Sequence, residues 1–315
     1  MTGTGIPETR SPPPGVVLLA LYQGERFLGA QLDSIAAQEV PWRLVVSDDG
    51  STDAGPGIVR GFAGAHPGRV TLTRGPGQGA AANFRALLAG VPEDAGWAAL
   101  ADQDDVWRPG KLARALAALA AVPAGQAALY CSRVTLCDPA LRPSGASRPP
   151  YPPSFRHALV QTLVQGNTAV LNPAALALVR AAEPLTPPVV MHDWWLYQLV
   201  TGAGGTVILD PAETVLYRQH EGNVVGGNAG PRARLESFTR MLGGGHRAWG
   251  AQTLAALTPV RHLLTDENRR VLDAFTALHH GEMADRLVAM ARGGFRRQGP
   301  VSQAALWLAA TLGRL

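Results

Sequence analysis

Four short strand-like segments, each followed by a polar turn and a helix, most constrain the fold of this chain. The segments are Val16–Ala20, Leu44–Ser47, Val70–Thr73 and Trp97–Ala101. Continuous apolar strands are typical of a parallel sheet that is buried on both faces. Because the strands alternate with helices, the pattern predicts an α/β fold in which helices flank a mostly parallel, Rossmann-like sheet.

The turn after the fourth segment carries three carboxylates in four residues. Asp102, Asp104 and Asp105 follow Ala101, and leucines at helical spacing begin at Leu112. Open α/β sheets bind ligands at the carboxyl ends of their strands, where this turn must lie. Clustered carboxylates repel one another unless a cation or several donors satisfy them, and oxygen ligands suit Mg²⁺ or Mn²⁺. The alternative is a solvated acidic turn.

Two further turns carry polar residues after predicted strands. Asp48 and Asp49 could contact a ligand, or they could form an Asx turn that caps the next helix. The segment Gly75-Pro-Gly-Gln-Gly79 superficially resembles a dinucleotide-binding fingerprint. It follows the third strand and its spacing is wrong, so a Rossmann dehydrogenase is not favoured. Asn83 and Arg85, on the next helix, could reach a nucleotide or form an exposed polar face.

The second half of the chain is less regular. Ranges 127–130, 206–209 and 214–217 predict strands, and residues 138–153 predict a loop rich in Pro and Ser. A helix with apolar spacing opens at Met191, and glycines separate further helices after about residue 231.

These patterns predict three parts of the chain. Residues 1–15 consist of Thr, Gly, Pro and Ser and other poorly packing residues, which predicts a disordered tail. Residues 16–228 form the expected catalytic domain, and residues 229–315 form a C-terminal helical region.

The composition excludes few classes of protein, but it indicates in which cellular compartment the protein works. The formal net charge of +4 gives no argument for nucleic acid as a partner. Cys131 and Cys137 form neither a disulfide framework nor a zinc pattern. No stretch reaches the roughly 20 apolar residues that span a bilayer, and the run from Val16 is too short for a signal-peptide core. We therefore expect a cytoplasmic protein.

Five motifs occur in a fixed order along residues 16–225. They are Tyr22-Gln-Gly-Glu25, Ser47-Asp-Asp-Gly-Ser-Thr-Asp53, Asp102-Gln-Asp-Asp-Val-Trp107, His192-Asp-Trp-Trp195 and Tyr217-Arg-Gln-His220. Together they resemble the family 2 glycosyltransferases, inverting enzymes with the nucleotide-sugar-binding GT-A fold. The third and fourth motifs look most like the rhamnosyltransferase-like branch, which builds bacterial surface polysaccharides. That branch usually has Asn where this chain has Gln23, and Thr or Ser where it has Leu21.

The resemblance implies a role for each motif. The implied donor-binding residues are Leu21, Tyr22, Glu25, Asp48, Asp49, Asn83, Asp102, Gln103 and Asp104. The implied metal ligands are Asp104, Asp105 and His220, and Mg²⁺ or Mn²⁺ held there would neutralise charge on the leaving diphosphate. A lone histidine such as His220 can equally be structural. Trp107 and Trp194 flank this site and could carry an acceptor sugar on a flat ring, although burial is the default for both.

Asp193 is the expected catalytic base. It matches the acidic position at the start of this helix in the family, and it lies at a helix N-terminus, where peptide dipoles favour the ionised carboxylate. The alternative is that Asp193 only caps its helix. The expected activity is inverting transfer of a sugar, with rhamnose as a candidate, from a nucleoside-diphosphate donor to a polysaccharide or lipid-linked saccharide acceptor.

Two other functions fit parts of the pattern. A metal-dependent nucleotidyltransferase also uses Asp turns, but it needs an extended Gly-rich loop after the first strand, and Leu21–Glu25 is too short and acidic for this. A non-catalytic nucleotide-sugar-binding scaffold of a polysaccharide assembly complex would bind donor without turnover.

The C-terminal end of the chain is basic and apolar. From Arg286 onward there are five Arg and neither Asp nor Glu, and Phe295-Arg-Arg297 precedes an apolar segment around Trp307. The segment is too short to span a bilayer, but it could lie on anionic lipids at the inner face of the membrane. The alternative is a helix packed on the catalytic domain.

Overall fold

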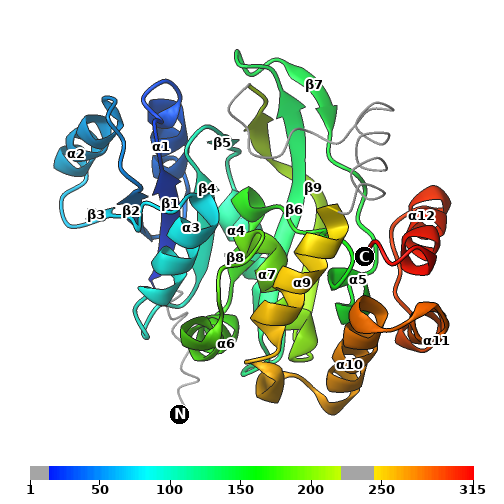
Figure 1. Ribbon diagram of the computed structural model, residues 1–315. Coiled ribbons are helices and arrows are strands. Elements are labelled where there is room, and N and C mark those ends of the chain that lie inside the picture. The colour runs from blue at the N-terminus through cyan, green and yellow to red at the C-terminus, as the bar shows by residue number, and fades with distance from the viewer. Residues whose placement is uncertain (1–13, 221–244) are drawn as a thin grey trace, which may run out of the picture.

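The computed structural model describes residues 14–220 and 245–315. A nine-stranded sheet crosses this part of the molecule in the order β3-β2-β1-β4-β8-β6-β9-β5, with β7 paired to β6 (Figure 1). The strands are β1 (Gly15–Leu21), β2 (Trp42–Asp48), β3 (Val70–Arg74), β4 (Ala98–Asp102), β5 (Val106–Trp107), β6 (Ala128–Cys137), β7 (Pro143–Ala146), β8 (Val170–Leu171) and β9 (Thr206–Arg218).

Helices follow most of these strands. The α-helices are α1 (Leu28–Ala36), α2 (Gly55–Ala65), α3 (Ala80–Ala89), α4 (Lys111–Ala120), α5 (Phe155–Ala158), α6 (Pro173–Ala182), α7 (His192–Gly202), α9 (Gly245–Leu257), α10 (Asp266–His280), α11 (Met283–Gly293) and α12 (Pro300–Thr311). Single 3₁₀ turns are η1 (Gly166–Thr168), η2 (Glu183–Leu185) and η3 (Arg261–Leu263).

The first four strands have the predicted parallel arrangement. β1 pairs in parallel with β2 and with β4, and β2 pairs in parallel with β3. Their carboxyl ends are in register, because Leu21 lies opposite Asp48 and Ala20 lies opposite Asp102. The polar turns that follow these strands therefore meet at one edge of the sheet, where α/β proteins place their ligands.

Beyond β4 the sheet is mixed, which differs from the expected mostly parallel arrangement. β8 is antiparallel to β4 and β6, and β5 is antiparallel to β9, whereas β6 and β9 are parallel. The two strands predicted between 206 and 217 form the single strand β9. Pro211 interrupts their apolar pattern where β9 shifts its register against β6, since proline in a sheet is tolerated at a bulge. β7 lies within the predicted loop 138–153.

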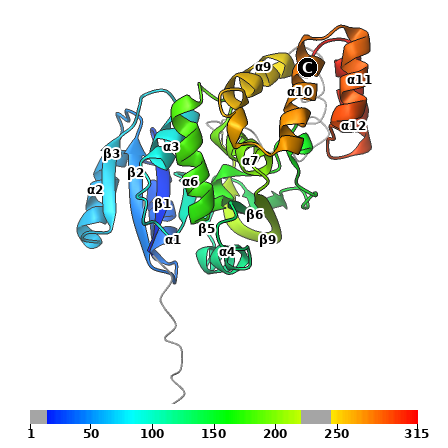
Figure 2. The same ribbon diagram turned by 90° about the horizontal axis from the view of Figure 1, so that it is seen from below.

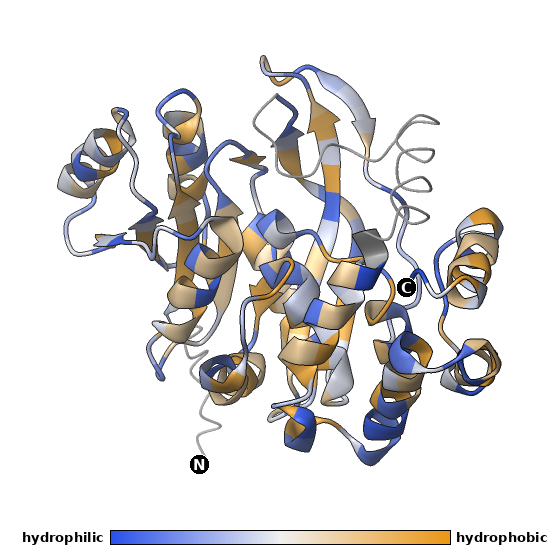
Figure 3. Ribbon diagram, in the orientation of Figure 1, coloured by the Kyte–Doolittle hydropathy of each residue, from blue (hydrophilic) through white to orange (hydrophobic). Residues whose placement is uncertain are grey.

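Alternate residues of β1 contribute to two separate cores. Val16 and Leu18 pack in a cluster with residues of α3, α6 and α7. Val17 and Leu19 pack in a second cluster with residues of α1, α2 and α4. Helices therefore cover both faces of the sheet, as expected (Figure 2). The apolar strands between them stand out in the hydropathy colouring (Figure 3).

The C-terminal helices extend the first core. Buried Leu254 of α9, Phe275 of α10 and Leu306 of α12 belong to the same cluster as Leu129 of β6 and Leu196 of α7. The predicted C-terminal helical region is thus helical over residues 245–315 and shares a core with the sheet.

The predicted boundary between residues 228 and 229 lies outside the described residues, and so does most of the predicted tail. Gly15, which was included in that tail, belongs instead to β1 and pairs with Trp42 of β2. The ring of Trp97 occupies the space that a side chain at Gly15 would need, so a glycine permits this close approach.

Two histidines are buried in helices of the second half of the chain, His157 in α5 and His279 in α10. His157 is 1% exposed and His279 is 7% exposed. Burial, followed by the charge of Arg297, lowers the pKa of His157 from 6.5 to about 4. Burial, followed by the charges of His280 and Arg247, lowers the pKa of His279 to about 4.

These shifts predict acid destabilisation between pH 6.5 and 4. In this window the unfolded chain binds more protons than the folded chain, so the free energy of unfolding falls as the pH decreases. Each histidine should remove about 2 kcal/mol by pH 4.5. Urea unfolding of His279→Gln should show a shallower pH dependence than the wild type. Identical pH slopes for His279→Gln and the wild type would contradict the assignment.

Candidate active site

Gln103 joins the turn after β1 to the acidic turn after β4. Its Oε1 accepts a hydrogen bond from the main-chain N–H of Tyr22 at 2.8 Å, and its Nε2 donates to the Tyr22 carbonyl oxygen at 2.8 Å. The side chain of Leu21 is buried in the core, whereas Tyr22 is 58% exposed at the rim. Of these three predicted donor-binding residues, Tyr22 therefore presents its side chain to solvent, and Gln103 fixes the two turns together.

The backbone at Gln23 explains a preference of the family that the motifs resemble. Gln23 has a φ of 50°, in the left-handed region, which asparagine adopts more readily than most residues. The branch usually has Asn at this position. Here the main-chain N–H of Gln23 donates to Ser51 Oγ at 3.0 Å, and its Nε2 donates to Thr52 Oγ1 at 2.9 Å, so the longer side chain keeps the turn attached to the next one.

Glu25 is held at the start of α2. Its Oε2 accepts from the Ala54 N–H at 2.9 Å, and its own N–H donates to Asp53 Oδ2 at 2.8 Å. The turns after β1 and β2 are therefore linked in both directions. A contact between Glu25 and a nucleotide stays a prediction.

The carboxylate of Asp49 organises the glycine-rich loop after β3. Asp49 Oδ1 accepts from the Gly77 N–H at 2.6 Å, and Asp49 Oδ2 accepts from the Gly79 N–H at 2.7 Å. Asp48 Oδ1 accepts from the Ser51 N–H at 3.0 Å, which is the Asx turn considered from the sequence. Both carboxylates are thus used locally, and each keeps further acceptor capacity for a ligand.

Asn83 and Arg85 hold α3 in place. Asn83 is 1% exposed, and its Nδ2 donates to the Ser47 carbonyl oxygen at 2.9 Å. Arg85 is 8% exposed; its guanidinium pairs with Glu183 at 2.7 Å and donates to the Thr186 carbonyl oxygen at 2.6 Å. The exposed polar helix face considered for these two residues is therefore wrong, because both side chains are buried in packing contacts.

Asp104 and His220 meet although they lie 116 residues apart in the chain. His220 Nε2 lies 2.7 Å from Asp104 Oδ2. Phe27, from the turn after β1, packs beside His220 with a ring separation of 5.2 Å. The end of β9 is thereby brought to the acidic turn, and an oxygen and a nitrogen ligand lie side by side at the sheet edge.

Asp105 points into the protein instead. It is fully buried; its Oδ2 accepts from Asn167 Nδ2 at 2.6 Å and its Oδ1 accepts from the Arg218 N–H at 3.2 Å. Arg218 Nε also donates to the Asp104 carbonyl oxygen at 2.8 Å. Asp105 thus uses both oxygens to anchor the turn, which favours a structural role over metal binding.

The carboxyl groups of the acidic turn disfavour one another's ionisation. Burial, then the neighbouring Asp104 and Asp193 carboxylates, raise the pKa of Asp102 to about 7. Burial, then Asp102 and Asp104, raise the pKa of Asp105 well above its usual range, opposed by the hydrogen bonds from Asn167 and Arg218. Carboxylates this close together favour a cation beside them.

Lys111 lies beneath this turn in the core. It is 1% exposed, and its Nζ lies 3.7 Å from the centroid of the Trp107 ring. Burial lowers the pKa of Lys111 to about 7, against the charges of Cys131 and Asp105. Trp107 is 2% exposed, so its ring is a core element that offers no open face to a sugar.

Asp193 lies in the first turn of α7, beside the acidic turn. Its Oδ2 accepts from the Gly166 N–H at 3.1 Å, and its Oδ1 accepts from the Trp194 N–H at 2.7 Å. The N-cap position belongs to Met191. Gly166 adjoins Asn167, the partner of Asp105, so η1 connects the predicted base to the acidic turn.

Trp194 is also a packing residue. It is 7% exposed, its Nε1 donates to the Ala158 carbonyl oxygen at 2.6 Å, and its ring meets Trp249 edge-on at 5.8 Å. The predicted acceptor contacts at Trp107 and Trp194 therefore fall on buried rings, and we leave both out of the site.

The sequence alone does not identify two residues that shape the site. Asn167 and Arg218 satisfy the buried carboxylate of Asp105 and so fix the turn. Arg218 stands in the motif that ends at His220, but nothing in the sequence shows that its main chain is the donor. Asn167 stands in a turn before a strand, and its pairing across 62 residues is visible only in the fold.

The donor set suits a divalent cation that is shared with a substrate. Asp104 and His220 supply one oxygen and one nitrogen within reach of each other. In the described ranges, no group of three or more His, Cys, Asp or Glu residues could hold a metal by itself. Mg²⁺ and Mn²⁺ are commonly held by one or two side chains together with substrate phosphates, so the residues fit such an ion.

The fold and the edge at which these residues gather define a sugar-nucleotide transferase of the GT-A class. Residues 16–166 match the family model described as glycosyl transferase family 2. Residues 16–166 therefore form a glycosyl transferase family 2 domain, and the similarities described below indicate a glycosyltransferase. The match decides against the nucleotidyltransferase and the non-catalytic scaffold considered from the sequence.

Several curated proteins are similar in sequence. The dTDP-rhamnosyl transferase RfbG of Shigella flexneri is 28% identical over 226 residues, which cover 69% of this chain and 77% of that protein. An uncharacterized protein of Mycobacterium tuberculosis, Rv1520, is 29% identical over 205 residues, which cover 63% of this chain and 57% of that protein. The first of these supports the rhamnosyltransferase-like branch.

Solved structures share the fold. TarS of S. aureus (residues 1–349), in complex with UDP-GlcNAc, has a TM-score of 0.56 at 14% identity and covers 94% of this chain and 79% of its own. The mannosyltransferase PcManGT of Pyrobaculum calidifontis, in complex with GDP-Man and Mn²⁺, has a TM-score of 0.53 at 18% identity. The match covers 97% of this chain and 85% of the mannosyltransferase chain. At these identities the likeness concerns the fold.

Across residues 14–220 and 245–315, every helix is too short or too polar to cross a bilayer.

Proposed function

We propose that this glycosyltransferase transfers rhamnose, with inversion, from a nucleoside-diphosphate donor to a saccharide acceptor that is lipid-linked or part of a growing surface polysaccharide. The Asp104–His220 contact carries this proposal, because it joins the acidic turn to the end of β9 at the donor edge of the sheet. The similarity to a dTDP-rhamnosyl transferase supports the choice of sugar.

In the proposed site the donor nucleotide lies over the turns after β1 and β2. Tyr22 offers an exposed ring there, and Asp48 and Asp49 offer acceptor capacity for the base or ribose. Asp102 lies at the end of β4, opposite Ala20 of β1. Asp104 and His220 would hold Mg²⁺ or Mn²⁺, which when bound neutralises charge on the departing diphosphate.

Asp193 acts as the base in this proposal. An inverting transfer needs one carboxylate that accepts the proton of the acceptor hydroxyl as this oxygen attacks the anomeric carbon. The N–H groups of Gly166 and Trp194 hold the Asp193 carboxylate in one orientation. Each oxygen retains a lone pair that can accept the proton. The site would work in the cytoplasm, next to the inner face of the membrane where a lipid-linked acceptor is available.

The metal assignment predicts the behaviour of Asp104→Asn. This change keeps the size of the side chain but removes one charge and one metal ligand, so turnover should fall by at least about 100-fold. The measurement is the rate of nucleoside diphosphate release from dTDP-rhamnose in the presence of a saccharide acceptor, with Mn²⁺ or with EDTA. Asp138→Asn, on an exposed loop, is the matched control. Full activity in excess EDTA, or near-normal activity of Asp104→Asn, would sink the assignment.

The base assignment predicts a separation of binding from turnover. Asp193→Asn keeps an oxygen that can accept from Gly166 or Trp194, so the fold and donor binding should persist. Loss of a general base should lower the transfer rate by roughly two to four orders of magnitude. Asp266→Asn makes the same change in the first turn of α10 and should leave the rate unchanged. If Asp193→Asn transfers sugar at close to the wild-type rate, the base lies elsewhere.

A further inference from the structure

Helices α11 and α12 expose several large apolar side chains to solvent. Nine large apolar side chains are exposed in the described ranges, and seven of them lie between residues 283 and 312. The seven are Met283, Leu287, Val288, Val301, Trp307, Leu308 and Leu312. We call this set the α11–α12 surface.

Helical spacing makes the α11 part of this surface continuous. Met283 and Leu287 are four residues apart, and Val288 lies beside them, with exposed Ala284 and Ala291 filling the same face. The opposite face of α11 holds Ala289 and other buried residues in the core. The exposed side of α11 is therefore apolar over nearly its whole length.

The same division holds for α12. Val301, Leu308 and Leu312 follow one side of the helix, with Trp307 at its edge, whereas Leu306 and Ala309 are buried on the other side. Trp307 is 38% exposed. Tryptophan is enriched where apolar and aqueous phases meet, because its ring is apolar and its N–H is polar.

The charges at the C-terminal end of α11 and beyond it are positive. From residue 286 to the end of the chain there are five Arg and no acidic residue. Arg292 and Arg296 are exposed at the end of α11 and directly after it. The acidic groups nearest in sequence, Glu282 and Asp285, stand at the start of α11. The apolar surface is thus bordered by cations at the end where α11 leads into α12.

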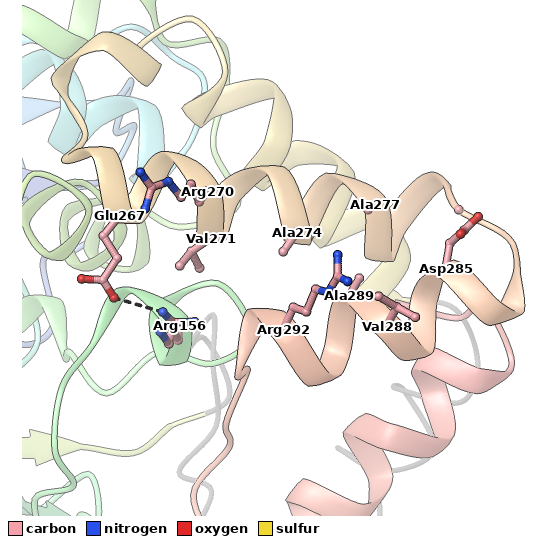
Figure 4. A pocket seen from close by; sticks show the side chains of 11 residues that line it. Arg156, Glu267, Arg270, Val271, Ala274, Ala277, Asp285, Val288, Ala289 and Arg292 are labelled. Carbon is pink, nitrogen blue, oxygen red and sulfur yellow. Dashed lines mark hydrogen bonds and ion pairs between the residues drawn. The ribbon is translucent and has the colours of Figure 1, made fainter.

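A groove of about 610 Å³ opens at the border of the surface, between α10 and α11 (Figure 4). Val271, Ala274 and Ala289 form its apolar floor, and Arg270 and Arg292 stand at its sides. Figure 4 shows Arg292 reaching from α11 toward α10. Arg156, Glu267 and Asp285 also line the groove, and Arg156 pairs with Glu267 at 3.0 Å. Arg270 and Arg292 beside the apolar floor offer two guanidinium groups to the phosphate of a lipid.

We infer that the α11–α12 surface docks on an anionic lipid bilayer, with the apolar side chains in the interface and the arginines on lipid phosphates. The 11 residues of α11 and 12 residues of α12 are too few to span a bilayer, so the helices would lie in its plane. A second copy of this chain is the other candidate occupant, because a two-fold contact would bury the same apolar patch of both copies; the test below separates the two.

Docking should be measured by sedimentation of the full chain with vesicles. The wild type should pellet with vesicles rich in phosphatidylglycerol at low salt, should be released at high salt, and should stay in solution with pure phosphatidylcholine. Asp193→Asn should pellet like the wild type, so that docking is tested separately from the proposed catalysis.

Two changes on the surface should weaken binding, each beside a matched control. Leu308→Ser should lower the vesicle partition coefficient about tenfold, whereas Leu185→Ser, an exposed leucine of η2, should leave it unchanged. The double change Arg292→Gln and Arg296→Gln should lower it about 25-fold, at about fivefold for each arginine. Arg60→Gln, on α2 at the opposite end of the molecule, should have no effect (Figures 1 and 2).

Three results would overturn the inference. The first is a wild type that does not pellet with phosphatidylglycerol vesicles. The second is a Leu308→Ser variant or arginine double variant that binds like the wild type. The third is a wild type that light scattering shows to be a dimer and that Leu308→Ser converts to a monomer, since a second copy would then be the occupant.

Discussion

The buried carboxylate of Asp105 is the contact on which the site depends. A buried charge is costly unless hydrogen bonds satisfy it. Here the donors come from Asn167, which lies 62 residues further along the chain, and from the N–H of Arg218, 113 residues away. The acidic turn, η1 and the end of β9 must therefore assemble together, because none of them satisfies Asp105 alone.

This assembly sets the positions of the groups that do chemistry in our account. With Asp105 turned inward, the neighbouring Asp104 is left at the sheet edge, where His220 lies 2.7 Å from it. Through Gly166, the same turn that supplies Asn167 also holds Asp193. The residues that we assign to cation binding and the residue that we assign as the base are thus positioned by the same buried carboxyl group. This suits a reaction in which the cation and the base must both be correctly placed around one donor sugar.

The sequence predicts the first half of the fold well, because the buried strands β1 and β4 leave continuous apolar runs, and β2 and β3 carry apolar residues at alternate positions. β1 to β4 and the turns after them fall where the runs end. The sequence is a poorer guide where long-range contacts, and not a periodic pattern, determine the structure. Around Pro211 the sequence predicts two strands, whereas the fold has one strand, β9, with a bulge at this point. Site residues follow the same rule. The motifs locate the acidic turns, whereas the inward direction of Asp105 and the burial of Trp107 depend on partners far away in the chain.

In the proposed function, the edge formed by β1, β2 and β4 binds a nucleoside diphosphate together with a cation at Asp104. Isothermal titration of the full chain with dTDP, in Mn²⁺ and then in EDTA, tests it most directly. A charge-assisted contact contributes about 1.5–3 kcal/mol, so the account predicts a Kd at least about tenfold weaker in EDTA. An equal Kd in Mn²⁺ and EDTA, or no binding of the nucleotide in either, would contradict it.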